Sequence, residues 1–178
     1  MALSVPRRKR SPGKRLSFAR RTPRVLLGYR RMLVPLADNP ESEKAIDVAS
    51  RLAAEHDASI IAIAVIEVPA LLPLDAHMVE EEREAHRLLD RATALAELYG
   101  ISVSARTVHA RDAASAIVDQ ATGNKIETIL IGAPRKERAS RGVALFGSTV
   151  EHVLKKAHCR VLLIGTPVAE NAKPQAAG

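Results

Sequence analysis

Aromatic residues, cysteines and long apolar runs are all scarce in this sequence, and each scarcity excludes a class of protein. Two tyrosines and two phenylalanines are the only aromatic residues among 178, so few side chains are available to stack on bases, which argues against a nucleic-acid partner. Cys159 is the only cysteine and can form neither an internal disulfide nor a multi-cysteine zinc site, so we expect a reduced, cytoplasmic protein. The longest apolar run covers residues 60–66, far short of the roughly 20 residues that span a bilayer.

Acidic residues are absent from the first 37 positions, where basic residues are concentrated. The chain contains 27 Lys or Arg and 20 Asp or Glu, and ten of the basic residues lie within residues 1–30. The rest of the chain therefore carries a net charge of −3, although the whole chain carries +7. We conclude that the basic character belongs to an N-terminal arm and that the globular part is mildly acidic.

The basic arm, residues 1–30, has few apolar residues and no periodicity, and we predict that it is disordered. Several interpretations of it stay open. It could bind an anionic lipid surface or a membrane transporter, bind nucleic acid non-specifically, or serve as a transit-type peptide. It could also be a dispensable tail, with translation beginning at Met32. We expect one folded domain over residues 31–166 and a flexible tail over residues 167–178.

From residue 31 onward, the sequence predicts strands alternating with helices. Residues 59–66 are apolar without alternation, as in a strand buried on both faces, whereas residues 101–108 alternate as in an edge strand. Asn39 is placed to cap a helix that has Pro40 at its first position. The predicted strands cover residues 31–36, 59–66, 101–108, 127–131 and 160–164, and the predicted helices cover residues 41–55, 78–99, 112–123 and 147–158.

This alternation predicts a doubly wound α/β protein, a three-layer sandwich in which helices cover both faces of a five-stranded parallel sheet. Ligands of such sheets bind beyond the carboxyl ends of the strands, where the winding direction reverses. The loops that follow Leu36, Ile66 and Ile131 are therefore the first candidates for a binding site.

The segment from residue 132 to residue 146 combines glycines with basic residues and leads into a predicted helix. Its basic residues are Arg135, Lys136, Arg138 and Arg141, and its glycines are Gly132 and Gly142. Amides at the start of a helix, together with guanidinium groups, suit a phosphate. Without a ligand, Ser148 and Glu151 would instead form a capping box, and the basic residues would be solvated surface. Both interpretations stay open on these residues alone.

Three segments together resemble the universal stress protein family: MLVPL at residues 32–36, ILIGAP at residues 129–134, and GSTVEHVLKKAHCRVLLI at residues 147–164. The likeness covers residues 31–166. It implies a flavodoxin-like, adenine-nucleotide α-hydrolase-like fold with strand order 3-2-1-4-5, and a homodimer formed through the last strand. It also implies a stress-response role without established catalytic turnover, with ATP, accompanied by Mg²⁺, bound at the switch point in many members.

The resemblance implies a nucleotide site, but this sequence departs from the family pattern at two positions. ATP-binding members of the family carry the motif Gly-x2-Gly-x9-Gly-(Ser/Thr). In this sequence, Arg135 stands where the motif has its second glycine, and eleven residues instead of nine separate it from Gly147. Ala37 stands where the family has an aspartate, with Asp38 one residue later. The nucleotide-binding residues predicted on this basis are Pro35, Ala37, Val65, Gly132, Arg135, Gly142, Gly147, Ser148 and Thr149.

A second hypothesis follows from the variants VPLADNP and GAPRK…LFGSTV, which are similar to stress-protein-like domains appended to the cytosolic end of some amino-acid permeases. It predicts a regulatory module that is associated with amino-acid transport and binds no nucleotide. We expect no enzyme, because no G-x-S-x-G elbow or acid–base pair is present, although slow ATP hydrolysis stays open. We interpret His152, His158 and Cys159 as packing or surface residues, and we expect no metal site.

Overall fold

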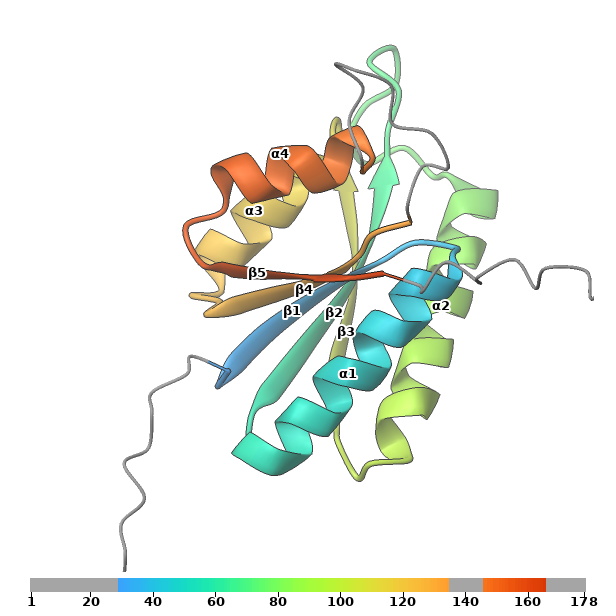
Figure 1. The fold of residues 1–178 in the computed structure, drawn as a ribbon. Helices are drawn as coiled ribbons and strands as arrows, with labels where there is room; N and C mark the ends of the chain where they lie inside the picture. The colour runs from blue at the N-terminus through green and yellow to red at the C-terminus, as the bar shows by residue number, and fades with distance from the viewer. Residues whose placement is uncertain (1–28, 135–145, 166–178) are drawn as a thin grey trace, which may run out of the picture.

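The computed structural model describes residues 29–134 and 146–165 (Figure 1). Most of the predicted basic arm, the whole predicted C-terminal tail and the candidate residues Arg135 and Gly142 lie outside the described residues. Tyr29 and Arg30, which precede the first strand, contact the folded domain. The Tyr29 ring stacks on His56 with 5.5 Å between centroids, and the Arg30 backbone N–H donates to the Glu127 carboxylate at 3.1 Å.

The five strands form one parallel sheet in the order β3-β2-β1-β4-β5. This order confirms the predicted fold class, with the first strand at the centre. The direction of winding reverses between β1 and β4, which places the switch point at their carboxyl ends. The strands are β1 (Arg31–Leu36), β2 (Ser59–Glu67), β3 (Val103–Ala110), β4 (Thr128–Gly132) and β5 (Arg160–Ile164).

Four helices connect the strands and cover both faces of the sheet, so the three-layer arrangement is as predicted (Figure 1). The helices are α1 (Pro40–His56), α2 (Val79–Glu97), α3 (Ala113–Gly123) and α4 (Ser148–Lys156). The first two lie side by side on one face, and the last two lie on the other. None of these helices is both long and apolar enough to cross a bilayer.

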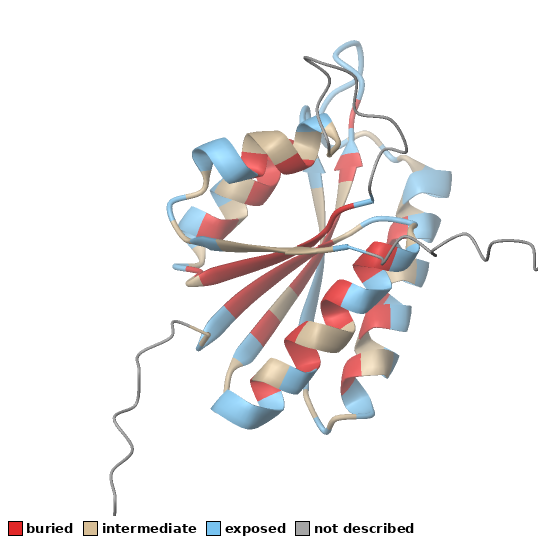
Figure 2. Cartoon of the chain, viewed as in Figure 1, coloured by how far each residue is buried: buried red, intermediate tan, exposed pale blue. Residues whose placement is uncertain are grey.

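The core has two halves, one on each face of the central strands (Figure 2). Met32 and Val34 of β1 pack with Ile46 of α1, whereas the intervening Leu33 packs with Ile117 of α3. All of these side chains are buried. Since successive side chains of a strand point to opposite faces, a strand covered on both sides is mostly apolar, as residues 32–36 of β1 and 129–131 of β4 are.

The third strand begins two residues later than predicted, at Val103, because the turn after α2 takes up Ile101. Gly100 adopts a positive φ of 71°, which favours glycine, and the Ile101 backbone N–H donates to the Ala96 carbonyl at 3.1 Å. These contacts end the helix, and residues 101 and 102 therefore belong to the turn, although their alternation predicts a strand. The prediction that this strand lies at an edge of the sheet is confirmed.

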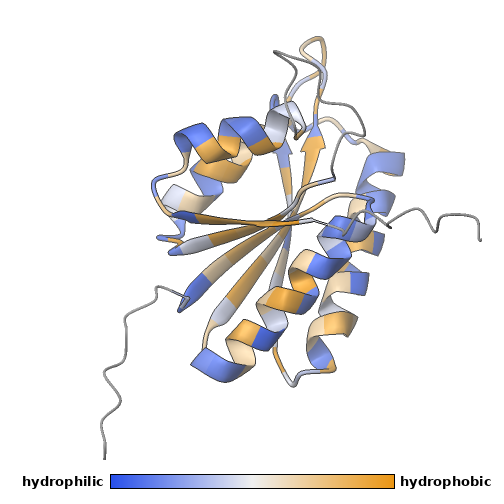
Figure 3. Cartoon of the chain, viewed as in Figure 1, coloured by the Kyte–Doolittle hydropathy of each residue, from blue (hydrophilic) through white to orange (hydrophobic). Residues whose placement is uncertain are grey.

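The two edges of the sheet differ in polarity (Figure 3). Exposed positions of β3 include Ser104, Arg106 and His109, whereas residues 161–164 of β5 are all aliphatic and half-buried. β5 is therefore the apolar edge strand that the predicted homodimer requires. The dimer itself stays a prediction.

Candidate functional site

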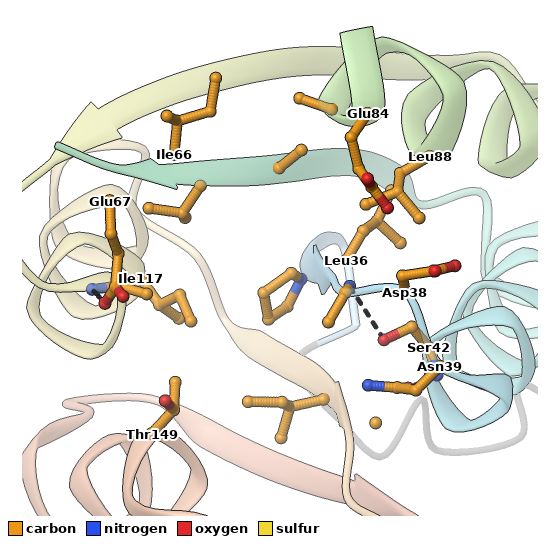
Figure 4. Close-up of a pocket in the computed structure, with 18 of the residues that line it drawn as sticks. Leu36, Asp38, Asn39, Ser42, Ile66, Glu67, Glu84, Leu88, Ile117 and Thr149 are labelled. Carbon is orange, nitrogen blue, oxygen red and sulfur yellow. Dashed lines mark hydrogen bonds between the residues drawn. The ribbon is translucent and has the colours of Figure 1, made fainter. Parts of the chain in front are cut away.

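A pocket of about 800 Å³ opens at the carboxyl ends of β1, β2 and β4 (Figure 4). This is the position expected for a ligand in a doubly wound sheet, and the volume is within the range of small-molecule sites. The tips of the three strands form its floor, and the N-terminal ends of α2, α3 and α4 contribute to its walls. The pocket therefore lies at the predicted switch point.

The turn from β1 into α1 forms one side of the pocket and is closed by its own hydrogen bonds. Asn39 caps α1, because its side-chain oxygen accepts from the Ser42 backbone N–H at 2.8 Å. The buried Ser42 hydroxyl in turn accepts from the Ala37 backbone N–H at 3.1 Å. The N-terminus of α1 is thus capped by the protein itself, which confirms the predicted cap.

Gly132 ends β4 at the point where that strand meets the start of α1. A β-carbon at this position would lie 2.5 Å from the Ser42 nitrogen and 2.6 Å from the Glu41 carbonyl carbon. Both are backbone atoms, so a side chain at this position would have to displace the helix. The fold therefore requires a glycine here whether or not a ligand binds.

Gly147 stands at the start of α4 and has a different environment. It is the N-cap residue, in an extended conformation with φ −65° and ψ 159°, and no described atom lies within 4 Å of the position of a β-carbon. No side chain among the described residues caps this helix. Gly147 and Thr149 line the pocket, and the first amides of α4 have no side-chain acceptor among the described residues, so this helix end suits an anion.

The predicted capping box at Ser148 is wrong. A capping box needs the serine at the N-cap, but Gly147 occupies that position and Ser148 is the first helical residue. The Glu151 carboxylate lies 3.9 Å from the Lys155 ammonium one turn later, and the Glu151 backbone N–H donates to the Gly147 carbonyl. The serine–glutamate spacing is thus explained by helical geometry and not by a cap.

The N-terminus of α3 is capped by two carboxylates. Asp112 accepts from the Ser115 backbone N–H at 2.7 Å, and Glu67 at the tip of β2 accepts from the Ala113 backbone N–H at 2.7 Å. Hydrogen bonds from Ser115, first through its side chain and then through its backbone, hold the pKa of Asp112 below its usual value. Because an ionised carboxylate also interacts favourably with the positive end of the helix, both acids suit this place.

The wall contributed by α2 is rich in acidic residues that are mostly engaged in ion pairs. Glu80 receives two hydrogen bonds from Arg83, and Glu84 lies 3.5 Å from Arg87. Asp38, from the β1 side, pairs with Arg91 at 3.1 Å. Asp38 is therefore directed toward α2, and it also lines the pocket.

Six of the nine predicted site residues line this one pocket. Ser148 lies between two of them in sequence but does not line it, and Arg135 and Gly142 lie outside the described residues. The six lining residues are Pro35, Ala37, Val65, Gly132, Gly147 and Thr149.

Sequence reasoning missed Glu67 and Ile117 as pocket residues, and it predicted no pocket residue on α2. Glu67 ends a strand beside the switch point, so its position at a strand end could have identified it. No sequence pattern within α2 predicts that this helix lines the pocket, because that position depends on how the helix lies over the sheet.

Cys159 and its histidine neighbours lie away from this pocket. Burial raises the pKa of the Cys159 thiol, which disfavours the reactive thiolate. Among residues 29–134 and 146–165, no three His, Cys, Asp or Glu side chains are grouped so that they could hold a metal ion.

Comparison with known proteins identifies the family. The model of the universal stress protein family matches residues 28–165, which is most of the chain. The chain belongs to the universal stress protein family. A universal stress protein of Methanocaldococcus jannaschii is 29% identical over 148 residues, which cover 80% of this chain and 85% of that relative.

Solved structures of the family share the fold. A universal stress protein of Archaeoglobus fulgidus in complex with dAMP superposes with a TM-score of 0.60 at 19% identity, covering 76% of this chain and 98% of that one. Another universal stress protein, in complex with cAMP, gives a TM-score of 0.61 at 20% identity, covering 78% and 98%. The fold derived from the sequence pattern is thus that of universal stress proteins.

Proposed function

We propose that this universal stress protein is a regulatory protein that binds an adenine nucleotide in the pocket at the tips of β1, β2 and β4. The observation that carries the proposal is that no described side chain caps the N-terminus of α4, which lies beside a pocket of about 800 Å³ at the switch point. At the N-termini of α1 and α3, Asn39, Asp112 and Glu67 accept backbone hydrogen bonds. The N-cap residue of α2, Met78, provides no side-chain cap, but the acidic first turn of that helix repels an anion. The start of α4 is therefore the place for a phosphate.

The described residues fit such a ligand. Gly147 would let a phosphate approach the first amides of α4, since no side chain of the described residues beyond its chain neighbours lies within 4 Å of its β-carbon position, and Thr149 adds a hydroxyl group. Val65 and Ile117 provide apolar contacts for a base deeper in the pocket. We propose that the bound nucleotide acts as a charged regulatory ligand and that the protein does not turn it over.

The nature of two structural neighbours supports an adenine nucleotide as the ligand class, since those universal stress proteins are in complex with dAMP and cAMP. ATP accompanied by Mg²⁺ is our specific proposal for this chain. It extends the expectation that the family resemblance raised.

Equilibrium dialysis of the full chain with labelled ATP, with and without Mg²⁺, tests the proposal. We expect saturable binding near one nucleotide per chain, and release of labelled phosphate no faster than in buffer alone. No saturable uptake at millimolar nucleotide would reject nucleotide binding. Steady phosphate release would reject the regulatory, non-catalytic assignment.

The second candidate is a regulatory module beside an amino-acid transporter that binds no nucleotide. Ala37 and Arg135 favour it, because each replaces a residue that the family uses around the nucleotide, and Asp38 is engaged with Arg91. Native mass spectrometry of the freshly purified protein separates the two candidates. Co-purified nucleotide contradicts this second candidate.

Two further proposals concern partners. We propose a homodimer formed through β5, whose aliphatic side chains are half-buried at the edge of the sheet. Sedimentation velocity should give the mass of two chains, and a monomer at high micromolar concentration would contradict the dimer.

For the basic arm, we propose binding to an anionic membrane surface, which co-sedimentation with phosphatidylserine vesicles tests.

A further inference from the structure

We propose that Glu67 recognises the amino group of the adenine base and thereby selects the bound nucleotide. The inference rests on the proposed function, since it assigns one residue of that pocket to one part of the ligand. It concerns the tip of β2, which is separated from β4 by β1 in the sheet.

The order of the strands sets the direction in which a nucleotide lies. With its phosphate at the start of α4, which follows β4, the ligand extends across β1 to β2, because these strands are neighbours in that order. In a nucleotide, the sugar lies between the phosphate and the base. The sugar therefore lies over the tip of β1, and the base lies over the tip of β2, where Glu67 is.

The surroundings of Glu67 suit a base. Val65 points to the same face of β2 two residues earlier, and Ile117 of α3 lies beside Glu67 in the close-up view (Figure 4). Both side chains are aliphatic, and both line the pocket. Glu67 is thus a charged acceptor next to an apolar surface on which a planar ring can rest.

The carboxylate of Glu67 is held in position by the protein. One of its oxygens accepts from the Ala113 backbone N–H at 2.7 Å, at the N-terminal end of α3. A carboxylate has about four sites for accepting hydrogen bonds, so this anchor leaves acceptor capacity on a side chain that lines the pocket. An acceptor fixed in this way is better prepared for a ligand than a mobile side chain.

The chemistry of a carboxylate decides what this end of the pocket accepts. An ionised carboxylate only accepts hydrogen bonds, so it binds the amino group of adenine and repels a phosphate. Hydrogen bonds to charged groups contribute roughly 1.5 to 3 kcal/mol, which corresponds to about a 10- to 100-fold change in affinity. Because Glu67 is exposed, we expect an effect at the low end of this range.

The test compares AMP with purine riboside 5′-monophosphate, which is AMP without its amino group, in equilibrium dialysis with the full chain. We expect AMP to bind about tenfold more tightly to the wild type. In Glu67→Leu, the ratio of the two dissociation constants should fall to near one. In Glu67→Gln, whose amide oxygen can still accept from Ala113, the ratio should fall to an intermediate value.

Glu81→Leu is the matched control, because Glu81 also lines the pocket but belongs to α2 on its other wall. It removes the same charge and should keep the wild-type ratio. Thermal melting of each variant verifies that it is folded, and Glu67→Gln serves the test if Glu67→Leu does not fold.

The outcomes separate the inference from the proposed function. Equal binding of the two compounds by the wild type, or an unchanged preference in both Glu67 variants, overturns the role of Glu67 while nucleotide binding stands. An equal loss of preference in Glu81→Leu also overturns it. Binding of neither compound by the wild type rejects the proposed function and, with it, this inference.

Discussion

Gly132 and Gly147 stand on either side of the same pocket, and both match glycines of the family's nucleotide motif, yet the structure gives them different environments. Gly132 lies against the backbone at the start of α1, where a β-carbon would overlap with Ser42 and Glu41. Gly147 lies at the start of α4 with open space on its side-chain face, as far as the described residues extend. One motif glycine therefore serves the fold, and the other leaves room for a ligand.

The difference shows that a sequence motif can combine positions under unrelated constraints. A glycine that is required by a close backbone approach would be retained in a member that had lost its ligand. The presence of Gly132 is therefore weak evidence for nucleotide binding, whereas a substitution of Gly147 tests the proposed function directly.

Gly132→Ala should have the largest effect on stability. Contacts of 2.5 and 2.6 Å with backbone atoms cannot be relieved by a side-chain rotation, so the start of α1 must move. We expect a loss of about 2 to 3 kcal/mol in the free energy of unfolding, measured by urea denaturation followed by circular dichroism.

Gly123→Ala is the control for Gly132→Ala. Gly123 ends α3, and beyond its own helix backbone and chain neighbours no described atom lies within 4 Å of its would-be β-carbon, so alanine should be neutral or stabilise by about 0.5 to 1 kcal/mol. Equal stability of Gly132→Ala and the wild type would show that β4 and α1 do not approach so closely.

Gly147→Ala should do the reverse and affect binding more than stability. Its φ and ψ suit alanine, and the N-cap preference for glycine over alanine limits the loss of stability to about 1 kcal/mol. The added methyl group would lie between a phosphate and the first amides of α4. We expect about a tenfold loss of ATP affinity in equilibrium dialysis.

Retained affinity in folded Gly147→Ala would contradict the placement of the phosphate at α4. The wild-type chain and Gly123→Ala, which changes a glycine away from the pocket, provide the reference values. Together with Gly132→Ala, this variant tests whether the two glycines separate into a structural role and a ligand-binding role.

The sequence was sufficient for the fold but only partly sufficient for the site. The alternation of apolar segments predicts every strand and helix, because the covered strands must be apolar and the helices must have one apolar face. The close approach at Gly132 could not be predicted, since it joins residues 90 positions apart. The Ser148–Glu151 spacing was misleading because Gly147 takes the N-cap position.

The starts of α3 and α4 extend the comparison from glycines to caps. The two helices lie side by side on one face of the sheet, but Asp112 caps α3, whereas no described side chain caps α4. Where side chains of the protein already accept hydrogen bonds from the first backbone N–H groups of a helix, fewer of these groups remain to bind a ligand. The cap on α3 should therefore be measurable as pH-dependent stability that involves no nucleotide.

Asp112→Asn should give the smallest effect, a decrease of a few degrees in melting temperature at pH 7. Since the pKa of Asp112 is lowered in the folded protein, its charge stabilises the fold above the unfolded value of 3.8. That contribution is lost as the pH falls through the lower folded pKa. Asparagine keeps the capping oxygen without the charge, so the difference from the wild type should shrink below pH 3.8. We expect added nucleotide to change the melting temperatures of the wild type and of Asp112→Asn equally. A difference between the two proteins that is constant from pH 7 to pH 3 would mean that the charge of Asp112 does not stabilise α3.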